Sequence, residues 1–532
     1  MTEKEKVYTR QASGLVREIS AHEVLNYTLL SAGPLFFIAY GILLVPAEFV
    51  GGDMSVALLL LLPVLLCIAY NTSMLGAAMP RAGGDYVFGS RIVHPIWGLI
   101  PSASVLLSFI VGIGTLPPIA MEFFFAPALQ TSFPNSPIAT GIATALSSSP
   151  VEVGIGILLI GGGYALVAAS TRAWFWIIKI LQYGTLLTLL ALIGTLITAT
   201  SSGFQNTFNS YSSQYKISYS QVFTAAQSQG WSSPTFSLAA TVAVVIFSLF
   251  FLAAPLSVYF GGEVKEAKRS LPIGLIGGMA IAWVVAIVAV LAWFNVFPND
   301  FTSALSTIST SSAYTLPFPL SVNYLIQILT ANPILAFLIG FGITLNVIGF
   351  TISPMLPASR ILFSWAFDRL IPQKFASVNS RTHTPLFSYA VLAVLTIVVL
   401  IVSIYTSVIA ALFATTLLVA IGFTPNGFTA ALLPFRRKDI FEKAPAMVKR
   451  KIGPMPVLLL TGLIQGVGLG GMLVAMLLFF PATAGGPVNA TSLSVVLAVI
   501  VFAIVLYPIA RSYYKSREGI DIAWAYKEMP PE

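Results

Sequence analysis

Two long apolar stretches of the chain are each interrupted near the middle by residues that disfavour a regular helix. Residues 22–48 contain Ser31-Ala32-Gly33-Pro34, and residues 236–260 contain Ala253-Ala254-Pro255. Because proline lacks an N–H group and clashes with the preceding turn, each interruption leaves backbone groups without a helical partner. Free N–H groups at the start of a half-helix suit a carboxylate, and free carbonyl groups suit an ammonium ion. The interruptions therefore predict a site for a small zwitterion.

The spacing of the two interruptions strengthens this interpretation. They lie five apolar stretches apart, and paired interruptions at equivalent places in two halves indicate the central site of a membrane transporter. Proline alone is weaker support, because Pro and Gly are ordinary in membrane helices. Other apolar stretches also contain proline, at Pro63, Pro117, Pro118, Pro354, Pro357, Pro425 and Pro508.

The composition indicates which elements position these residues. Of the 532 residues, 57% are hydrophobic and 9% are charged, whereas a soluble domain is about one-quarter charged. So few charges cannot cover a surface in water, which excludes a soluble globular protein. A membrane-spanning helix needs about 20 apolar residues. The sequence predicts twelve such spans, at residues 22–48, 54–79, 96–127, 152–170, 174–200, 236–260, 273–297, 332–366, 385–405, 407–433, 455–481 and 491–514.

Basic residues predict the orientation of these spans. In the twelve-span arrangement the Lys and Arg residues gather on one side, and only Lys216 lies on the other. Because basic residues concentrate on the cytoplasmic side, we expect a multi-pass protein of the cytoplasmic membrane with both termini in the cytoplasm. The opposite loops, such as residues 200–235 and 301–316, are polar and almost uncharged. They form a neutral surface without further meaning, or one adapted to an acidic exterior, as around an acidophilic microbe.

The sequence lacks the motifs of an enzyme. It has no nucleotide-binding loop of the GxxxxGK[ST] type and no His-Glu metal motif. Its histidines, His22, His94 and His383, are far apart, and the lone Cys67 excludes a cysteine-based metal cluster. We therefore expect no catalytic residue, no cofactor and no bound metal. Besides a transporter, a solute channel and a transporter-like sensor or partner subunit stay open.

Three segments between the spans resemble motifs of the amino acid–polyamine–organocation (APC) superfamily of secondary transporters. Pro80-Arg81-Ala82-Gly83-Gly84-Asp85-Tyr86 is similar to its Pro-x-x-Gly-Gly-x-Tyr loop. The segment from Glu263 to Pro272 is similar to its Glu-Val-Lys-x-x-x-Arg-x-(Ile/Leu/Val)-Pro connection. Ala358-Ser359-Arg360, continuing to Asp368 and Pro372, is similar to its Ala-Ser-Arg…Asp-x-x-x-Pro segment. Their order and span numbers indicate a resemblance to prokaryotic and archaeal amino acid permeases.

The resemblance implies an all-α membrane protein with a leucine-transporter-like core. Spans 1–5 and 6–10 would form inverted repeats, with helices 1 and 6 broken, and spans 11 and 12 appended. The central site would lie between helices 1, 3, 6, 8 and 10. The implied units are a cytoplasmic tail at 1–21, a first repeat at 22–200, an extracellular loop at 201–235, a second repeat at 236–433, a cytoplasmic loop at 434–454, the last two spans at 455–514 and a tail at 515–532.

In this superfamily the unwound backbone of helices 1 and 6 binds the substrate, and Phe250 or Phe251 could close over it as an aromatic gate. The superfamily's Gly-Ser-Gly break in helix 1 is missing, and its Gly-x-Glu in helix 6 is replaced by Ala253-Ala254-Pro255. We expect the helix 1 break at Gly33-Pro34, with Ala39-Tyr40-Gly41 as the alternative. The implied substrate-binding residues are Ser31, Ala32, Gly33, Pro34, Phe250, Phe251, Leu252, Ala253 and Ala254.

The predicted substrate is a neutral or zwitterionic amino acid, because a polyamine would need a buried carboxylate and no ionisable residue lies clearly at mid-membrane. Two coupling ions are open. Thr351 and Ser353 could help hold Na⁺, since hard cations prefer oxygen ligands, or their hydroxyls could bond back to their own helix. The superfamily's helix 5 lysine falls nearer Thr185 than Lys179, which is interpreted as interfacial. Proton coupling is expected if the exterior is acidic.

The sequence thus predicts a secondary transporter that moves amino acids across the cytoplasmic membrane by alternating access, coupled to H⁺ or Na⁺ or by exchange. Its partners would be the small-molecule substrate and the lipid bilayer, with no nucleic acid. The specific amino acid, the direction of transport and the oligomeric state do not follow from the residues.

Overall fold

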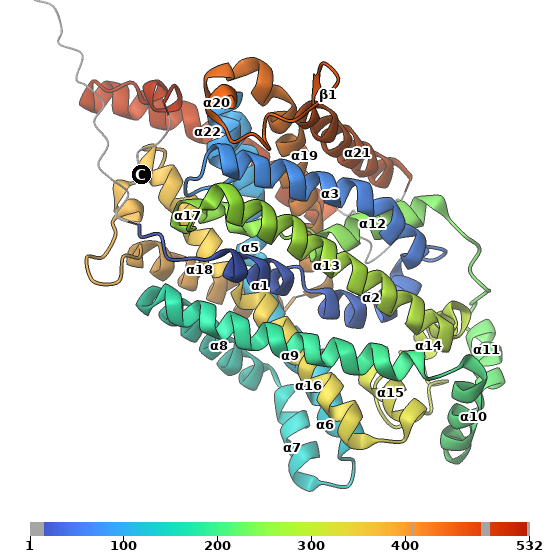
Figure 1. The fold of residues 1–532 in the computed structure, drawn as a ribbon. Coiled ribbons are helices and arrows are strands. Elements are labelled where there is room, and N and C mark those ends of the chain that lie inside the picture. Colours follow the sequence, from blue (N-terminus) through green and yellow to red (C-terminus); the bar gives the residue numbers. More distant parts are fainter. Residues whose placement is uncertain (1–14, 407, 480–489, 529–532) are drawn as a thin grey trace, which may run out of the picture.

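Long apolar helices make up nearly all of the protein, a computed structural model of which is shown in Figure 1. It describes residues 15–406, 408–479 and 490–528; the outer parts of both predicted tails, 1–14 and 529–532, lie outside this range. Within the described residues, eleven helices are long and apolar enough to cross a membrane. The only described strands form a two-residue hairpin, β1 (Lys451–Ile452) and β2 (Met455–Pro456). The expected all-α membrane protein is therefore confirmed.

The first half of the chain supplies five of these membrane-length segments. Its first helix begins with a capping box, in which Ser20 and Glu23 satisfy each other's backbone N–H groups. The third segment runs further than predicted and contains a π-helical turn, η1. The elements are α1 (Ala21–Ser31), α2 (Pro34–Glu48), α3 (Met54–Ala78), α4 (Asp85–Ile92), α5 (Pro95–Ile119), η1 (Ala120–Phe125), α6 (Ala126–Ser132), α7 (Pro137–Leu146), α8 (Ser149–Ala169) and α9 (Thr171–Ile197).

The second half supplies six more membrane-length segments and several short connecting elements. These connections include 3-10 turns between the longer helices. The elements are α10 (Ser201–Ser212), η2 (Ser213–Tyr215), α11 (Tyr219–Ser228), α12 (Leu238–Leu252), η3 (Leu256–Tyr259), η4 (Gly261–Glu263), α13 (Ala267–Val296), α14 (Asn299–Ile308), α15 (Val322–Thr330), α16 (Pro333–Ile352), α17 (Met355–Phe367), η5 (Gln373–Ala376), α18 (Leu386–Ile404), α19 (Val408–Arg436), α20 (Lys438–Lys443), α21 (Val457–Phe479), α22 (Ala490–Glu518) and η6 (Ile522–Tyr526).

Two predictions differ from this arrangement. The predicted span at residues 236–260 is helical only over the 15 residues of α12 and ends in 3-10 turns, because Pro255 cannot continue the helix. The twelve predicted spans therefore correspond to eleven long helices and this short one. The predicted loop at residues 201–235 contains two helices, α10 and α11. Their sequences are polar overall but include aromatic side chains that are buried, such as Phe204 and Phe208.

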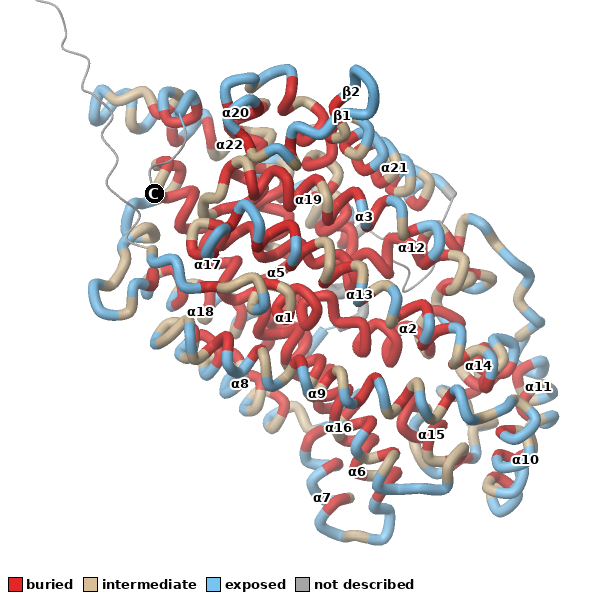
Figure 2. The backbone as a smooth tube through the Cα atoms, in the orientation of Figure 1, coloured by how far each residue is buried: buried red, intermediate tan, exposed pale blue. Residues whose placement is uncertain are grey.

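The first span lies at the centre of the bundle and the last at its edge. In the most apolar window of the α1–α2 segment 89% of residues are buried, against 22% for the final span. Figure 2 shows this contrast, with α1, α2 and α5 mostly buried and α8, α9 and α22 carrying exposed positions along their length. The exposed positions are largely Leu, Ile, Val and Phe, as expected for a surface that faces lipid.

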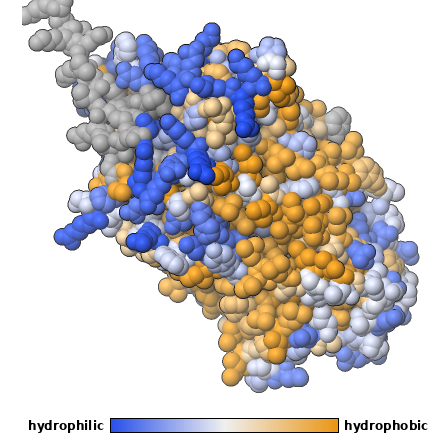
Figure 3. All heavy atoms as spheres, in the orientation of Figure 1, coloured by the Kyte–Doolittle hydropathy of each residue, from blue (hydrophilic) through white to orange (hydrophobic). Residues whose placement is uncertain are grey.

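Charged residues gather at one end of the molecule. Figure 3 shows hydrophilic residues concentrated at the end that carries α20, a hydrophobic belt across the middle, and a paler mixture near α10, α11 and α14. Contacts between distant segments hold the first end together: Arg437 donates to the Arg91 carbonyl, and Arg369 pairs with Glu518. We call it the basic end, and the end with α10, α11 and α14 the neutral end.

Candidate functional site

Helix 1 is broken at Gly33. Helix α1 ends at Ser31, Gly33 has a left-handed backbone with φ +49°, and α2 begins at Pro34. Proline suits this first position of a new helix because its missing N–H would have no helical partner there. The break predicted at Gly33-Pro34 is therefore confirmed, and the alternative at Ala39-Tyr40-Gly41 is wrong, because those residues lie inside α2.

Helix 6 is broken immediately before Pro255. Ala253 has an extended backbone, with φ −89° and ψ 96°, and the chain continues as the 3-10 turn η3. Of the residues expected in unwound backbone, Ala253 and Ala254 fit, but Phe250, Phe251 and Leu252 form the last turn of α12. These three were misplaced because the apolar run before Ala253 keeps its helical hydrogen bonds up to the break.

A small buried cavity of about 40 Å³ lies between the two breaks. That volume is enough for about three water molecules. Five of the implied site residues line it, namely Ser31, Phe250, Ala253, Ala254 and Ser353. Ala32, Gly33, Pro34, Phe251, Leu252 and Thr351 are buried nearby but are not part of its lining. The remaining wall comes from Val105, Ser108, Phe109, Gly112 and Leu116 of α5, Leu256 of η3, Phe350 and Pro354 beside the α16–α17 kink, and Val419 and Phe423 of α19.

The polar groups around this cavity are few and neutral. Ser31 Oγ is buried and has no hydrogen-bond partner within the described residues. Such an orphaned polar atom is rare in a folded interior and marks a place where a ligand group or water can bind. The Tyr27 hydroxyl donates to the Ser353 carbonyl over 2.9 Å, which ties α1 to the kink after α16.

The hydroxyls proposed for sodium bond back to their own helix. Thr351 Oγ1 donates to the Val347 carbonyl over 2.7 Å, and Ser353 Oγ donates to the Phe350 carbonyl over 3.0 Å. This is the back-bonding that hydroxyls in helices commonly make. Each oxygen keeps lone pairs, so the geometry describes the hydroxyls without deciding whether a cation binds them.

Four phenylalanines cover the cavity on the side of the neutral end. The rings of Phe36, Phe250, Phe251 and Phe350 lie 4.9 to 6.1 Å apart in edge-on or tilted pairs, an arrangement that favours aromatic contacts. Phe36 is in the first turn of α2 and Phe250 and Phe251 in the last turn of α12, so this phenylalanine cluster joins the two breaks.

A side chain from another helix caps one N–H group at the start of α2. Phe36 N–H donates to Asn346 Oδ1 over 2.9 Å, and Asn346 Nδ2 donates to Thr185 Oγ1 over 3.1 Å. Of the N–H groups expected to be free at the start of this half-helix, that of Phe36 is therefore already bonded, because an amide from α16 reaches across and caps it. Thr185, near the superfamily's lysine position, takes part in this neutral chain, whereas Lys179 lies against the exposed ring of Trp176, 4.6 Å from its centroid.

Three motifs far apart in sequence interlock at the basic end. Arg360 donates to both carboxylate oxygens of Glu263, over 2.6 and 2.9 Å, and both side chains are buried. Arg91 binds Asp368 over 2.6 and 2.9 Å, and the Tyr86 hydroxyl donates to the same carboxylate over 2.7 Å. Buried bidentate pairs of this kind fix the relative positions of the segments that carry them.

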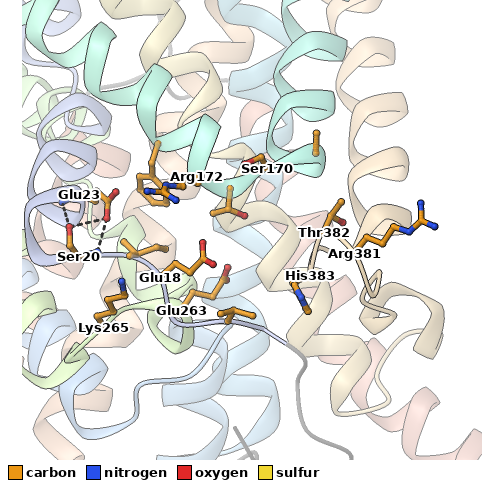
Figure 4. A pocket seen from close by; sticks show the side chains of 15 residues that line it. Glu18, Ser20, Glu23, Ser170, Arg172, Glu263, Lys265, Arg381, Thr382 and His383 are labelled. Atoms are coloured by element: carbon orange, nitrogen blue, oxygen red, sulfur yellow. Dashed lines mark hydrogen bonds between the residues drawn. The ribbon is translucent and has the colours of Figure 1, made fainter.

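A second hollow opens at the basic end, with a volume of about 660 Å³. Figure 4 shows its charged and polar lining, with Glu18, Ser20 and Glu23 before and in α1, Arg172 at the start of α9, and Arg381 and His383 after α17. It shares no lining residue with the central cavity, and Glu263 in its wall is held by Arg360. The buried ion pair therefore stands at the inner limit of this hollow.

Comparison with known families gives this arrangement its context. A family model for amino acid permeases matches residues 24–514. The chain belongs to the amino acid permease family. It is thus a multi-pass membrane transporter of the APC superfamily, with amino acids as the substrates that the family implies, and not an enzyme. Among curated proteins, none has a sequence that matches this chain.

Sequence reasoning missed three residues that shape the site of this permease. Phe36, Asn346 and Phe350 contact both breaks or cap the half-helix, yet nothing in their local sequence distinguishes them from ordinary membrane-helix residues. Asn346 offered the only signal, since a buried amide in an apolar span needs a polar partner. That signal could indicate a partner but not which helix supplies it.

Proposed function

We propose that this permease is a secondary transporter of a neutral, zwitterionic amino acid that works by alternating access. The observation that carries the proposal is the central cavity between the two helix breaks. Every described residue that lines it is uncharged. A substrate with a net charge would be left there without a counter-ion in a low-dielectric interior, which is costly, whereas helix ends and backbone carbonyls can satisfy both charges of a zwitterion.

The proposed binding residues are those at the breaks. Ser31, Ala32, Gly33 and Pro34 supply the helix 1 backbone, and Ala253 and Ala254 supply that of helix 6. Phe250, Phe251 and Leu252 contribute side chains from the last turn of α12, with Phe250 in the cavity wall. The phenylalanine cluster would be the outer closure of the site, and the two buried Arg–carboxylate pairs its inner closure.

The proposed topology has twelve crossings, with α12 and its following turn as the sixth. Residues 22–200 and 236–433 then form the two inverted repeats, and residues 455–514 the appended pair. The gathering of basic residues at one end supports a cytoplasmic location for that end and for both termini. The almost uncharged neutral end would face outward, where it suits an acidic exterior. Coupling is to H⁺ or Na⁺ or by exchange, with Thr351 and Ser353 as the proposed sodium ligands.

Counterflow in proteoliposomes tests this function. Vesicles containing the purified full-length protein are preloaded with one unlabelled amino acid at a time, and uptake of the same labelled amino acid is followed. A carrier is expected to show saturable uptake that preloading accelerates at least fivefold over empty vesicles. Uptake that neither saturates nor responds to preloading would indicate a channel. The absence of uptake for every neutral amino acid would overturn the proposal and favour a sensor or another solute class.

A further inference from the structure

Three carboxylates are buried at the basic end, and one of them differs from the other two. Glu263, Asp368 and Asp85 are 4%, 1% and 1% exposed. Glu263 is bound to Arg360, and Asp368 to Arg91. Asp85 instead accepts a hydrogen bond from the hydroxyl of Tyr259. It is therefore the buried acid of this group that has a neutral partner in place of an arginine.

Asp85 follows a loop, residues 80–84, that contacts the segment after the helix 6 break, residues 256–260, here called the inner segment of helix 6. It is the first residue of α4, and the loop before it donates from Gly83 N–H to the Tyr259 carbonyl over 2.8 Å. Ala82 forms a bridge with Phe260. A Cβ atom on Gly84, whose φ is +47°, would lie 2.8 Å from the Tyr259 ring, so only glycine fits this approach. The carboxylate thus bonds to the segment that follows the helix 6 break.

The side chains that act most strongly on the Asp85 carboxyl are the neutral Tyr259 and Asn426. Helix α5 carries no titratable residue, and α19 carries only Arg436, at its end. The one charged residue of α17 is Arg360, which is bound to Glu263. The only titratable residue of η3 is Tyr259 itself. On its own helix, Tyr86 and Arg91 both bind Asp368. Arg81, earlier in the loop, donates to the Pro80 carbonyl.

The carboxylate of Asp85 can accept a proton. Within the described residues, Oδ1 of Asp85 has no hydrogen bond of good geometry, although the Asn426 amide lies near enough to favour the charged form of the carboxylate. Burial raises the pKa of the Asp85 carboxyl to about 6, although Tyr259 and Asn426 favour its charged form. The group therefore changes charge between an acidic exterior and a neutral cytoplasm.

Asp85 is connected to the central cavity through one pair of rings. Phe109 lines the cavity, and its ring packs edge-on against that of Tyr259, with centroids 6.1 Å apart. Tyr259 in turn lies four residues after Pro255, in the turn that begins at the helix 6 break. This contact would give a rearrangement at the break a direct route to the hydroxyl that donates to Asp85.

We propose that Asp85 is the proton-carrying residue of the transport cycle, so that the coupling ion is H⁺. This inference rests on the proposed function as an amino acid transporter. One proton from the outer solution binds Oδ1 when the outer closure is open, and the same proton leaves to the basic end when the inner closure opens. Neutralising Asp85 weakens its bond with Tyr259 and releases the inner segment of helix 6 from the loop at 80–84. One positive charge then crosses with each zwitterion.

The test compares the wild type with Asp85→Asn in proteoliposomes containing the full-length protein. The wild type is expected to accumulate its amino acid at least tenfold under an inward proton gradient and to acidify the lumen, as reported by trapped pyranine. Asp85→Asn is expected to lose both, and its remaining counterflow is expected to be independent of pH between 5 and 8. Asp53→Asn makes the same chemical change at an N-cap of the neutral end and is the matched control.

A second variant keeps the inference testable if Asp85→Asn does not fold. Tyr259→Phe removes the hydroxyl that favours the charged carboxylate, so the pKa of Asp85 rises further and the pH midpoint of uptake shifts upward by about 0.5 to 1 unit. An unchanged midpoint, or proton-driven accumulation by Asp85→Asn, would overturn the inference. So would accumulation by the wild type under a sodium gradient alone. Wild-type counterflow without response to protons would refute only this inference, whereas absence of counterflow would refute the proposed function.

Discussion

The ring of Phe350 packs against the backbone of Gly33, so closely that a Cβ atom there would lie 2.6 Å from Cδ2 of the ring. Phe350 also contacts Phe36 and Phe250, with ring centroids 5.6 Å away in each pair. One side chain of α16 therefore touches the helix 1 break and both half-helices that cover the cavity. The break and its aromatic cover are a single packed unit, and a change in one must alter the other.

Gly33→Ala should damage transport and stability together. The added Cβ meets the Phe350 ring, and a left-handed backbone costs a residue other than glycine about 1–2 kcal/mol. We expect counterflow to fall at least tenfold and the thermal midpoint in detergent to fall by several degrees. Gly41→Ala is the control, because Gly41 lies inside α2, where alanine stabilises a helix by about 0.5–1 kcal/mol. The added Cβ would lie 3.1 Å from the end of the flexible Met54 side chain and at ordinary contact distance from the Phe247 and Phe37 rings. Equal damage from both variants would contradict the assignment of the break.

Phe250→Ala should widen the range of amino acids that are accepted. Phe250 lines the cavity of about 40 Å³, and its removal opens space there for a larger substrate side chain. The ratio of kcat/KM for large over small neutral amino acids is expected to rise about tenfold. Phe247→Ala removes the same ring one turn earlier, outside the cavity lining. Both variants lose about 3–5 kcal/mol of core packing, so a selectivity change shared by both would show that Phe250 is not part of the site.

The Arg360–Glu263 pair should show a strong pairwise coupling. Glu263→Leu leaves a buried guanidinium without its counter-ion, and Arg360→Met leaves a buried carboxylate without its own, and each loss typically costs about 3–5 kcal/mol. Replacing both residues, as Arg360→Met with Glu263→Leu, removes the buried charges and is expected to be less destabilising than either single change. Thermal unfolding of the four proteins in one detergent measures this cycle. Additive losses would mean that the two side chains do not depend on each other.

The breaks could be predicted from the sequence because their cause is local. Gly33-Pro34 and Pro255 act through their own backbone constraints, and those constraints hold in almost any surroundings. The same locality explains the confirmed membrane helices, whose apolar composition reflects the bilayer and not a particular neighbour. Where the local signal was ambiguous, as at residues 236–260, apolar sequence continued past the end of the helix and the predicted span came out too long.

The contacts across the bundle could not be predicted in this way. Arg360 and Glu263 are 97 residues apart, and both were recognised in motifs without any indication that they bind each other. Asn346 and Phe36 are 310 residues apart, and the hydrogen bond between them caps one N–H group at the start of α2 that the sequence predicts to be free. Local propensity contains no information about such partners, because only the packing of spans decides which residues meet.

The stability of the protein should depend on pH through Asp85. Burial raises the pKa of this carboxyl from its ordinary value of 3.8 to about 6 in the folded protein. A raised acid pKa means that the folded state binds the proton more tightly than the unfolded state, so stability rises as the pH falls from above 6 to about 4. At about 1.4 kcal/mol per pKa unit, the effect is on the order of 2–3 kcal/mol.

Asp85→Asn cannot titrate, and its neutral amide resembles the protonated acid. We therefore expect this variant to be more stable than the wild type at pH 7.5, and the difference in thermal midpoint to shrink toward zero at pH 4.5. Because other carboxyl groups titrate equally in both proteins, the comparison isolates Asp85. A constant offset between Asp85→Asn and the wild type would mean that Asp85 stays charged throughout, and this result would not depend on any assumption about the transported substrate.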